Sequence, residues 1–198
     1  LATALGMPRE MAEKIVPISE NNPLVEEKTG LASNESFGGI FNMTPKVNDI
    51  VERFGIVGPD GVNLLVMGTV KVGNTGCMCG ANALLRVLIQ HLLIQRGEVV
   101  IMDMEAGLEH LGRGTARRVD VMIVVIEPRM KSIDTASRVI KLAKEIDIPN
   151  IIAVGNKISN PEEKEFIREK TGQLNLPVAA YIPFDAAVAK ADMKGIPL

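Results

Sequence analysis

Two cysteines separated by one residue form the sharpest chemical signal in the sequence. Cys77 and Cys79 lie in a glycine-rich segment, residues 73–81, directly before a stretch with helical periodicity. The dipole and free amides at a helix N-terminus favour thiolates, and so short a spacing disfavours an unstrained disulfide between the two. The pair could therefore bind a metal ion, or could simply pack as two small side chains at the start of a helix.

The number of cysteine sulfurs in one chain indicates whether a metal site would need a second chain. A closed tetrahedral site takes four ligands, whereas one chain supplies only two thiolates here. A two-fold dimer that pairs this loop with itself would complete such a site. Thiolates suit both nickel and zinc, so the residues do not choose between Ni²⁺ and Zn²⁺.

A second candidate follows an apolar run at residues 99–104. Asp103 closes this run, and an acid at Glu105 and a glycine at Gly107 come directly after it. In open α/β sheets ligands bind beyond the carboxyl ends of the strands. A carboxylate there can hold Mg²⁺ or its water, and a glycine amide can approach a phosphate oxygen. Alternatively, Asp103 only caps a turn after a buried strand.

Two further apolar runs end in residues suited to a nucleotide base. The run at residues 151–154 leads into Asn156 and Lys157, and the run at residues 178–182 leads into Pro183. The Asn amide both donates and accepts, so it can read the edge of a purine, while the Lys stem can cover the face of the base. The Pro183 carbonyl can accept a further hydrogen bond. Surface loops also contain Asn-Lys, so this pattern alone is weak.

The elements that would position these residues alternate between short apolar runs and helical patterns. Strands are expected at residues 64–67, 99–104, 121–126, 151–154 and 178–182. Helices are expected at residues 81–96, 132–146 and 161–171, the last of them capped by Asn160. This alternation predicts an α/β fold, a mostly parallel sheet flanked by helices. Residues 1–63 are rich in proline and show only short helical candidates, at 12–15 and 45–54, so we expect one domain over residues 1–198.

Composition excludes several function classes. The 198 residues are 46% hydrophobic and carry a formal charge of -2, with no Trp and one Tyr. A near-neutral chain has no positive electrostatic field to attract a phosphate backbone, and few aromatic side chains are available to stack on bases. We therefore expect no nucleic-acid binding. We expect no membrane association and a cytoplasmic location, because no apolar run approaches the length of a membrane span.

Taken together, these motifs resemble a known family. Four segments carry the resemblance: the Cys77-Met78-Cys79 loop, the run from Asp103 to Arg113, the segment from Val124 to Pro128, and Gly155-Asn156-Lys157. They occur in the order found in the CooC-type accessory ATPases of carbon monoxide dehydrogenase, also called nickel-insertion proteins, which the sequence resembles. Those proteins belong to the dimerising P-loop ATPases, with the MinD and ParA proteins and the nitrogenase iron protein.

The resemblance implies roles for the candidate residues. Asp103 would act through Mg²⁺ and its waters, and Gly107 would sense the γ-phosphate. Asn156 would read adenine, with Lys157 beside it and the Pro183 backbone helping. Cys77 and Cys79 of two subunits would hold Ni²⁺ or Zn²⁺ in a homodimer that serves a carbon monoxide dehydrogenase.

One family motif does not occur in the sequence. No G-x-x-x-x-G-K-[ST] segment is present, although the family carries a lysine-rich phosphate-binding loop of this kind on its first strand. With Leu1 as the first residue, we expect a fragment of a working ATPase that lacks the first strand and its loop. Such a chain would bind ATP very weakly and be inactive by itself.

Two other functions fit this class of ATPase. An iron–sulfur electron-transfer ATPase takes its cluster cysteines from two separated positions, whereas both cysteines here lie in one C-x-C. A ParA-like or MinD-like partitioning switch works through a basic DNA-binding patch or an amphipathic membrane tail, and neither is visible in the sequence.

Overall fold

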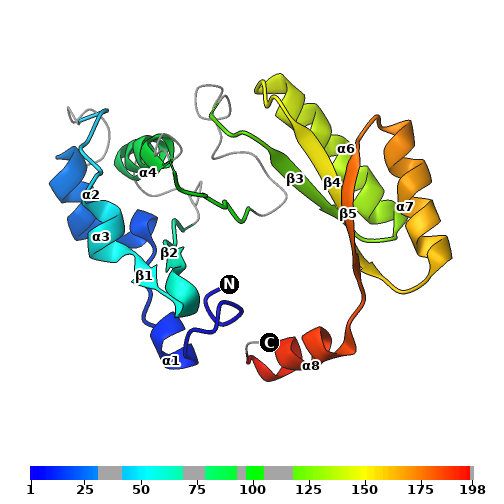
Figure 1. The fold of residues 1–198 in the computed structure, drawn as a ribbon. Coiled ribbons are helices and arrows are strands. Elements are labelled where there is room, and N and C mark those ends of the chain that lie inside the picture. The colour runs from blue at the N-terminus through cyan, green and yellow to red at the C-terminus, as the bar shows by residue number, and fades with distance from the viewer. Residues whose placement is uncertain (31–41, 69–78, 93–96, 105–117, 197–198) are drawn as a thin grey trace. The chain divides into compact units, whose positions relative to one another are not determined.

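The computed structural model describes residues 1–30, 42–68, 79–92, 97–104 and 118–196 (Figure 1). Contacts divide the chain into two units, one made of residues 1–95 and 187–198 and the other of residues 96–186. The expectation of one domain over residues 1–198 stays a prediction. No helix within the described ranges is both long enough and apolar enough to span a membrane.

The first unit consists mainly of short helices. They are α1 (Arg9–Ala12), the 3-10 turn η1 (Ile18–Glu20), α2 (Asn22–Thr29), α3 (Ile50–Phe54), the 3-10 turn η2 (Pro59–Gly61), the longer α4 (Cys79–Leu92) and α8 (Ala186–Lys194), which follows the second unit. The strands β1 (Ile56–Val57) and β2 (Asn63–Leu64) form an antiparallel pair. Leu84 and Leu88 of α4 are fully buried against Ile18, Leu24 and Ile50, so α4 anchors the core of this unit.

An ion network joins α2 to the start of α3. Lys28 Nζ lies 2.7 Å from Asp49 Oδ1, and Arg53 Nη1 lies 2.8 Å from Glu27 Oε1 and 2.7 Å from Asp49 Oδ2. Hydrogen bonds from Arg53 are the main cause that lowers the pKa of Glu27 from 4.5 to about 2. The carboxylates are therefore charged throughout the neutral range.

The second unit is a three-stranded parallel sheet in the order β3-β4-β5. Its elements are β3 (Met122–Ile126), α6 (Met130–Glu145), β4 (Ile151–Ile158), α7 (Pro161–Gln173) and β5 (Val178–Pro183). These confirm the predicted strands 121–126, 151–154 and 178–182 and the helices between them, although β4 extends four residues further. The predicted cap is also present, since Asn160 Oδ1 accepts a hydrogen bond from the Glu163 backbone N–H at 2.9 Å.

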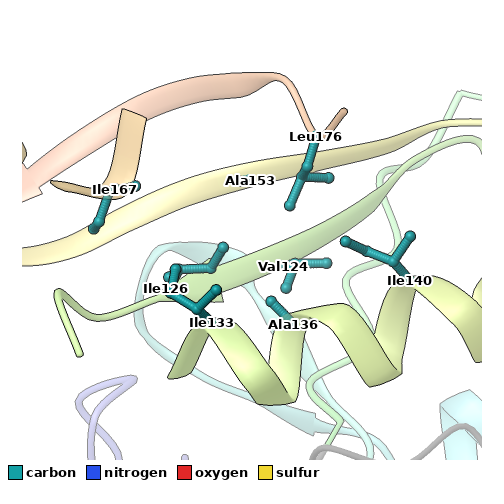
Figure 2. Packing of buried hydrophobic residues seen from close by; sticks show 8 residues of the cluster. All are labelled: Val124, Ile126, Ile133, Ala136, Ile140, Ala153, Ile167 and Leu176. Carbon is teal, nitrogen blue, oxygen red and sulfur yellow. The ribbon is translucent and has the colours of Figure 1, made fainter. Parts of the chain in front are cut away.

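The helices of the second unit pack on one face of its sheet. Figure 2 shows Ile133, Ala136 and Ile140 of α6 packed on Val124 and Ile126 of β3, with Ile167 of α7 and Ala153 of β4 in the same cluster. Alternate residues point to the opposite face, where Ile123 and Val125 are each 58% exposed. The two helices of the unit therefore cover a single face of the sheet.

Two predicted strands do not form as expected. Residues 97–104 contain no regular secondary structure, and Val99 and Ile101 are 90% and 86% exposed. Met102 and Met104 pack instead against the cluster of Ala143 and Ile148. The strand predicted at residues 64–67 is reduced to Asn63–Leu64. An apolar run becomes a strand only where another strand supplies hydrogen-bonding partners, and the sheet of this unit ends at β3.

Candidate functional site

The candidate site lies where the three parallel strands of the second unit end. Because parallel strands run in one direction, their carboxyl ends meet at one edge of the sheet. Ile126 pairs with Gly155, and Ile158 pairs with Pro183. Asn156 and Lys157 near the end of β4 are thus brought beside Pro183 at the end of β5, as the nucleotide-base prediction requires.

The backbone at Asn156 and Lys157 is unusual. Lys157 has a φ of +58°, in the left-handed region that side chains other than glycine seldom adopt. Its N–H donates to Asn156 Oδ1 at 3.0 Å, which fixes the orientation of the Asn side chain. The amide nitrogen of Asn156 is a donor and its oxygen keeps a second lone pair, so the side chain retains hydrogen-bonding capacity toward a purine edge.

Glu127 is a third polar residue at this edge and carried no assigned role in the sequence analysis. It follows the last residue of β3, and its Oε1 lies 2.6 Å from Lys157 Nζ. Its other oxygen, Oε2, is 3.8 Å from Arg129 Nε. The hydrogen bond from Lys157 lowers the pKa of Glu127, and Coulomb attraction to Lys157 and Arg129 lowers it further.

The backbone of Glu127 is anchored as well. Its N–H donates to Ser132 Oγ at 3.0 Å, in the first turn of α6. Ile126, directly before it, is fully buried beneath α6. The sequence does mark Glu127 as a candidate, because it is an acid directly after a buried apolar strand and before Pro128. Its ion-pair partner, Lys157, cannot be found from the sequence, because that pairing depends on the register between β3 and β4.

Asp103 is not brought to this edge. Its side chain is exposed, and the flanking Met102 and Met104 pack in a cluster with Met122 and Ile151, the first residues of β3 and β4. Those residues lie at the amino ends of the strands, opposite the edge that carries Asn156. The role of Asp103 stays a prediction, and an exposed carboxylate suits Mg²⁺, which keeps several waters and takes one or two carboxylates.

The predicted metal site lies largely outside the described residues. Cys77 and Gly107 both fall there, whereas Cys79 is the first residue of α4. The helix predicted beside the cysteines is therefore present over Cys79–Leu92. Within the described ranges, no group of three or more His, Cys, Asp or Glu side chains is placed to hold a metal ion.

Known proteins resemble this chain in sequence, and a solved structure resembles it in fold. A carbon monoxide dehydrogenase accessory protein CooC from Rhodospirillum rubrum is 41% identical over 196 residues, which cover 99% of this chain and 73% of that protein. The chain belongs to the CooC family. An ATP-binding protein of Methanocaldococcus jannaschii is 44% identical over 200 residues, covering all of this chain and 75% of that protein. No family model matches the chain.

A solved structure confirms the fold of this CooC-family chain. The crystal structure of a ParA family ATPase from Chlorobium tepidum aligns with a TM-score of 0.55 at 16% identity, over 75% of this chain and 60% of that one. The predicted α/β fold, a parallel sheet flanked by helices as in P-loop ATPases, is therefore correct.

Proposed function

We propose that this protein is an ATP-dependent maturation factor for a carbon monoxide dehydrogenase. In this proposal the full-length protein binds and hydrolyses ATP, dimerises around the nucleotide, and delivers Ni²⁺ as cargo to the catalytic cluster of its target. The main support is the 41% identity to the carbon monoxide dehydrogenase accessory protein CooC over almost the whole chain.

The edge formed by β4 and β5 supports the nucleotide part of the proposal. Asn156 is held in one orientation by the Lys157 N–H, and Pro183 lies in register with Ile158 on the adjacent strand. An Asn side chain can form two hydrogen bonds to the N6 and N7 positions of adenine. Asn156 would read the base, the Lys157 stem would cover its face, and the Pro183 backbone would accept from it.

The Cys77-Met78-Cys79 motif supports the metal part. Two thiolates from each of two chains would give the four ligands of a closed site. Nickel and zinc both accept such a site, and we propose Ni²⁺ as the ion transferred because the motifs of the sequence resemble those of the nickel-insertion proteins.

Metal content tests this part directly. We expect the wild-type protein loaded with Ni²⁺ or Zn²⁺ to hold about one ion per two chains, the ratio of a four-thiolate site shared by a dimer. The double variant Cys77→Ala with Cys79→Ala should lose the ion, and Met78→Leu, which keeps both thiols, serves as the matched control. An undiminished metal-to-dimer ratio in the double variant would remove the proposed site.

Calorimetric titration with ATP and Mg²⁺ tests the nucleotide part. Because the amides of the lysine-containing loop supply most phosphate contacts in P-loop proteins, we expect weak binding that depends on the base end of the site. Asn156→Ala should weaken it further. Micromolar binding by this chain, or binding unaffected by Asn156→Ala, would contradict the proposed mode of binding.

A further inference from the structure

We propose that Glu127 is a positioning residue for the adenine end of the nucleotide site. Its carboxylate holds Lys157 Nζ toward β3, so that the lysine presents its aliphatic stem rather than its charge to the bound base. This inference rests on the proposed function, which places a nucleotide base beside Asn156 and Lys157.

A positioning residue is needed because a lysine side chain is flexible and its ammonium group is attracted to phosphate. Its ammonium is a strongly hydrated point charge on a flexible four-carbon stem, and phosphate is a favoured partner for it. An untethered Lys157, with a 57% exposed side chain, would turn toward any nearby phosphate oxygen. The contact of 2.6 Å with Glu127 Oε1 gives the ammonium a partner within the protein.

Glu127 is well placed to act as a fixed point. The Ser132 hydroxyl oxygen accepts a hydrogen bond from the Glu127 backbone N–H at 3.0 Å, and the preceding Ile126 is fully buried in the core of the unit. Lys157, by contrast, is an exposed residue near the end of β4, with a φ of +58°. The ion pair therefore joins the more exposed Lys157 side chain to Glu127, whose backbone is anchored at the end of β3.

The proposal predicts opposite effects on two simple ligands. Glu127→Gln removes the negative charge while keeping nearly the same shape. Adenosine should then bind more weakly because the Lys157 stem is no longer held, and inorganic pyrophosphate should bind more tightly because the ammonium is released. For a partly exposed ion pair we expect changes of about threefold in each dissociation constant.

Amide NMR titrations of the full chain measure both ligands at the same residues. Adenosine and pyrophosphate are titrated separately, and the shifts of the Asn156 and Lys157 amides give the two dissociation constants. Glu165→Gln is the matched control, because Glu165 is also a carboxylate paired with a cation, Arg168, but lies on α7. We expect this control to leave both constants unchanged.

Several outcomes would overturn the inference. A loss of affinity for both ligands in Glu127→Gln would indicate a merely structural role, and so would equal constants in Glu127→Gln and Glu165→Gln. Glu127→Asp keeps the charge and should still reject pyrophosphate, so tighter pyrophosphate binding in that variant would also refute the inference. Absence of adenosine shifts in the wild-type protein would instead overturn the base site of the proposed function, and this inference with it.

Discussion

Replacing Gly155 with alanine tests the packing directly beneath the candidate site. Gly155 is a buried residue of β4, one position before Asn156. A Cβ added there would lie 2.8 Å from Tyr181 Cδ1 and 3.3 Å from Ile167 Cδ1. Real side chains do not approach this closely, so the Tyr181 ring must move away from the sheet.

The cost follows from two opposing effects. Overpacking a well-packed core typically costs about 1–3 kcal/mol. Losing the flexibility of glycine in the unfolded chain returns about 0.4–1 kcal/mol. The Tyr181 ring is only half-buried and can tilt, although Lys164 Nζ lies 4.9 Å from its centroid on one side. We therefore expect Gly155→Ala to lower the free energy of unfolding by about 1–2 kcal/mol.

Tyrosine fluorescence can measure the stability of the Gly155→Ala variant. Tyr181 is the single tyrosine of a chain without tryptophan, so intrinsic fluorescence reports unfolding of the second unit at the site of the clash. For a unit of this size we expect the urea midpoint to fall by roughly 1 M. The fluorescence of the folded variant should also change, because the ring has moved.

Gly172→Ala provides the matched control within the same unit. Gly172 lies in α7, and a Cβ added there would meet no atom within 4 Å. The same substitution should therefore raise stability by about 0.5 kcal/mol through helix propensity. If Gly155→Ala were as stable as the wild type, or if both variants shifted the midpoint in the same direction, the packing argument for Gly155 would be wrong.

Two further substitutions test local interactions. Glu27→Gln should lower stability at neutral pH, because the pKa of Glu27 is held at about 2, below its ordinary 4.5, chiefly by Arg53. A depressed carboxyl pKa stabilises the fold above pH 4.5, and this contribution is lost as the pH falls toward 2. The difference in urea midpoint by circular dichroism should shrink over that window, and a difference independent of pH would contradict the reasoning. Asn160→Ala removes the cap of α7 and should cost about 1 kcal/mol by Tyr181 fluorescence. Amide hydrogen exchange in the first turn of α7 should rise as well, and an unchanged rate would show that the cap contributes little.

The second unit was the most predictable part of the fold. Its strands are short runs of Val, Ile and Ala separated by helices with clear starts, and each signal is local. Asn160, Pro161 and Glu163, for example, mark the start of α7 within four consecutive residues, and the structure has the helix begin there. The carboxyl-edge location of Asn156, Lys157 and Pro183 followed from strand direction alone.

The failures involve non-local information. The run at residues 99–104 has the composition of a strand, but strand formation depends on a hydrogen-bonding neighbour that no local pattern reports. Asp103 was expected at a strand end by the same argument, and its role stays a prediction. The Glu127–Lys157 pair could not be predicted for a related reason, since it depends on which residue of β4 lies opposite Ile126.

The order of the strands in the second unit has a consequence for how it forms. The strands β3, β4 and β5 are neighbours in the sheet in the same order as in the chain, so each strand pairs with the one that precedes it, with a single helix in between. The loop-closure entropy at each step is therefore lower than it would be for strands that pair across longer stretches of chain. We expect this sheet to assemble early and to be the last part of the protein to lose its amide protection under denaturing conditions.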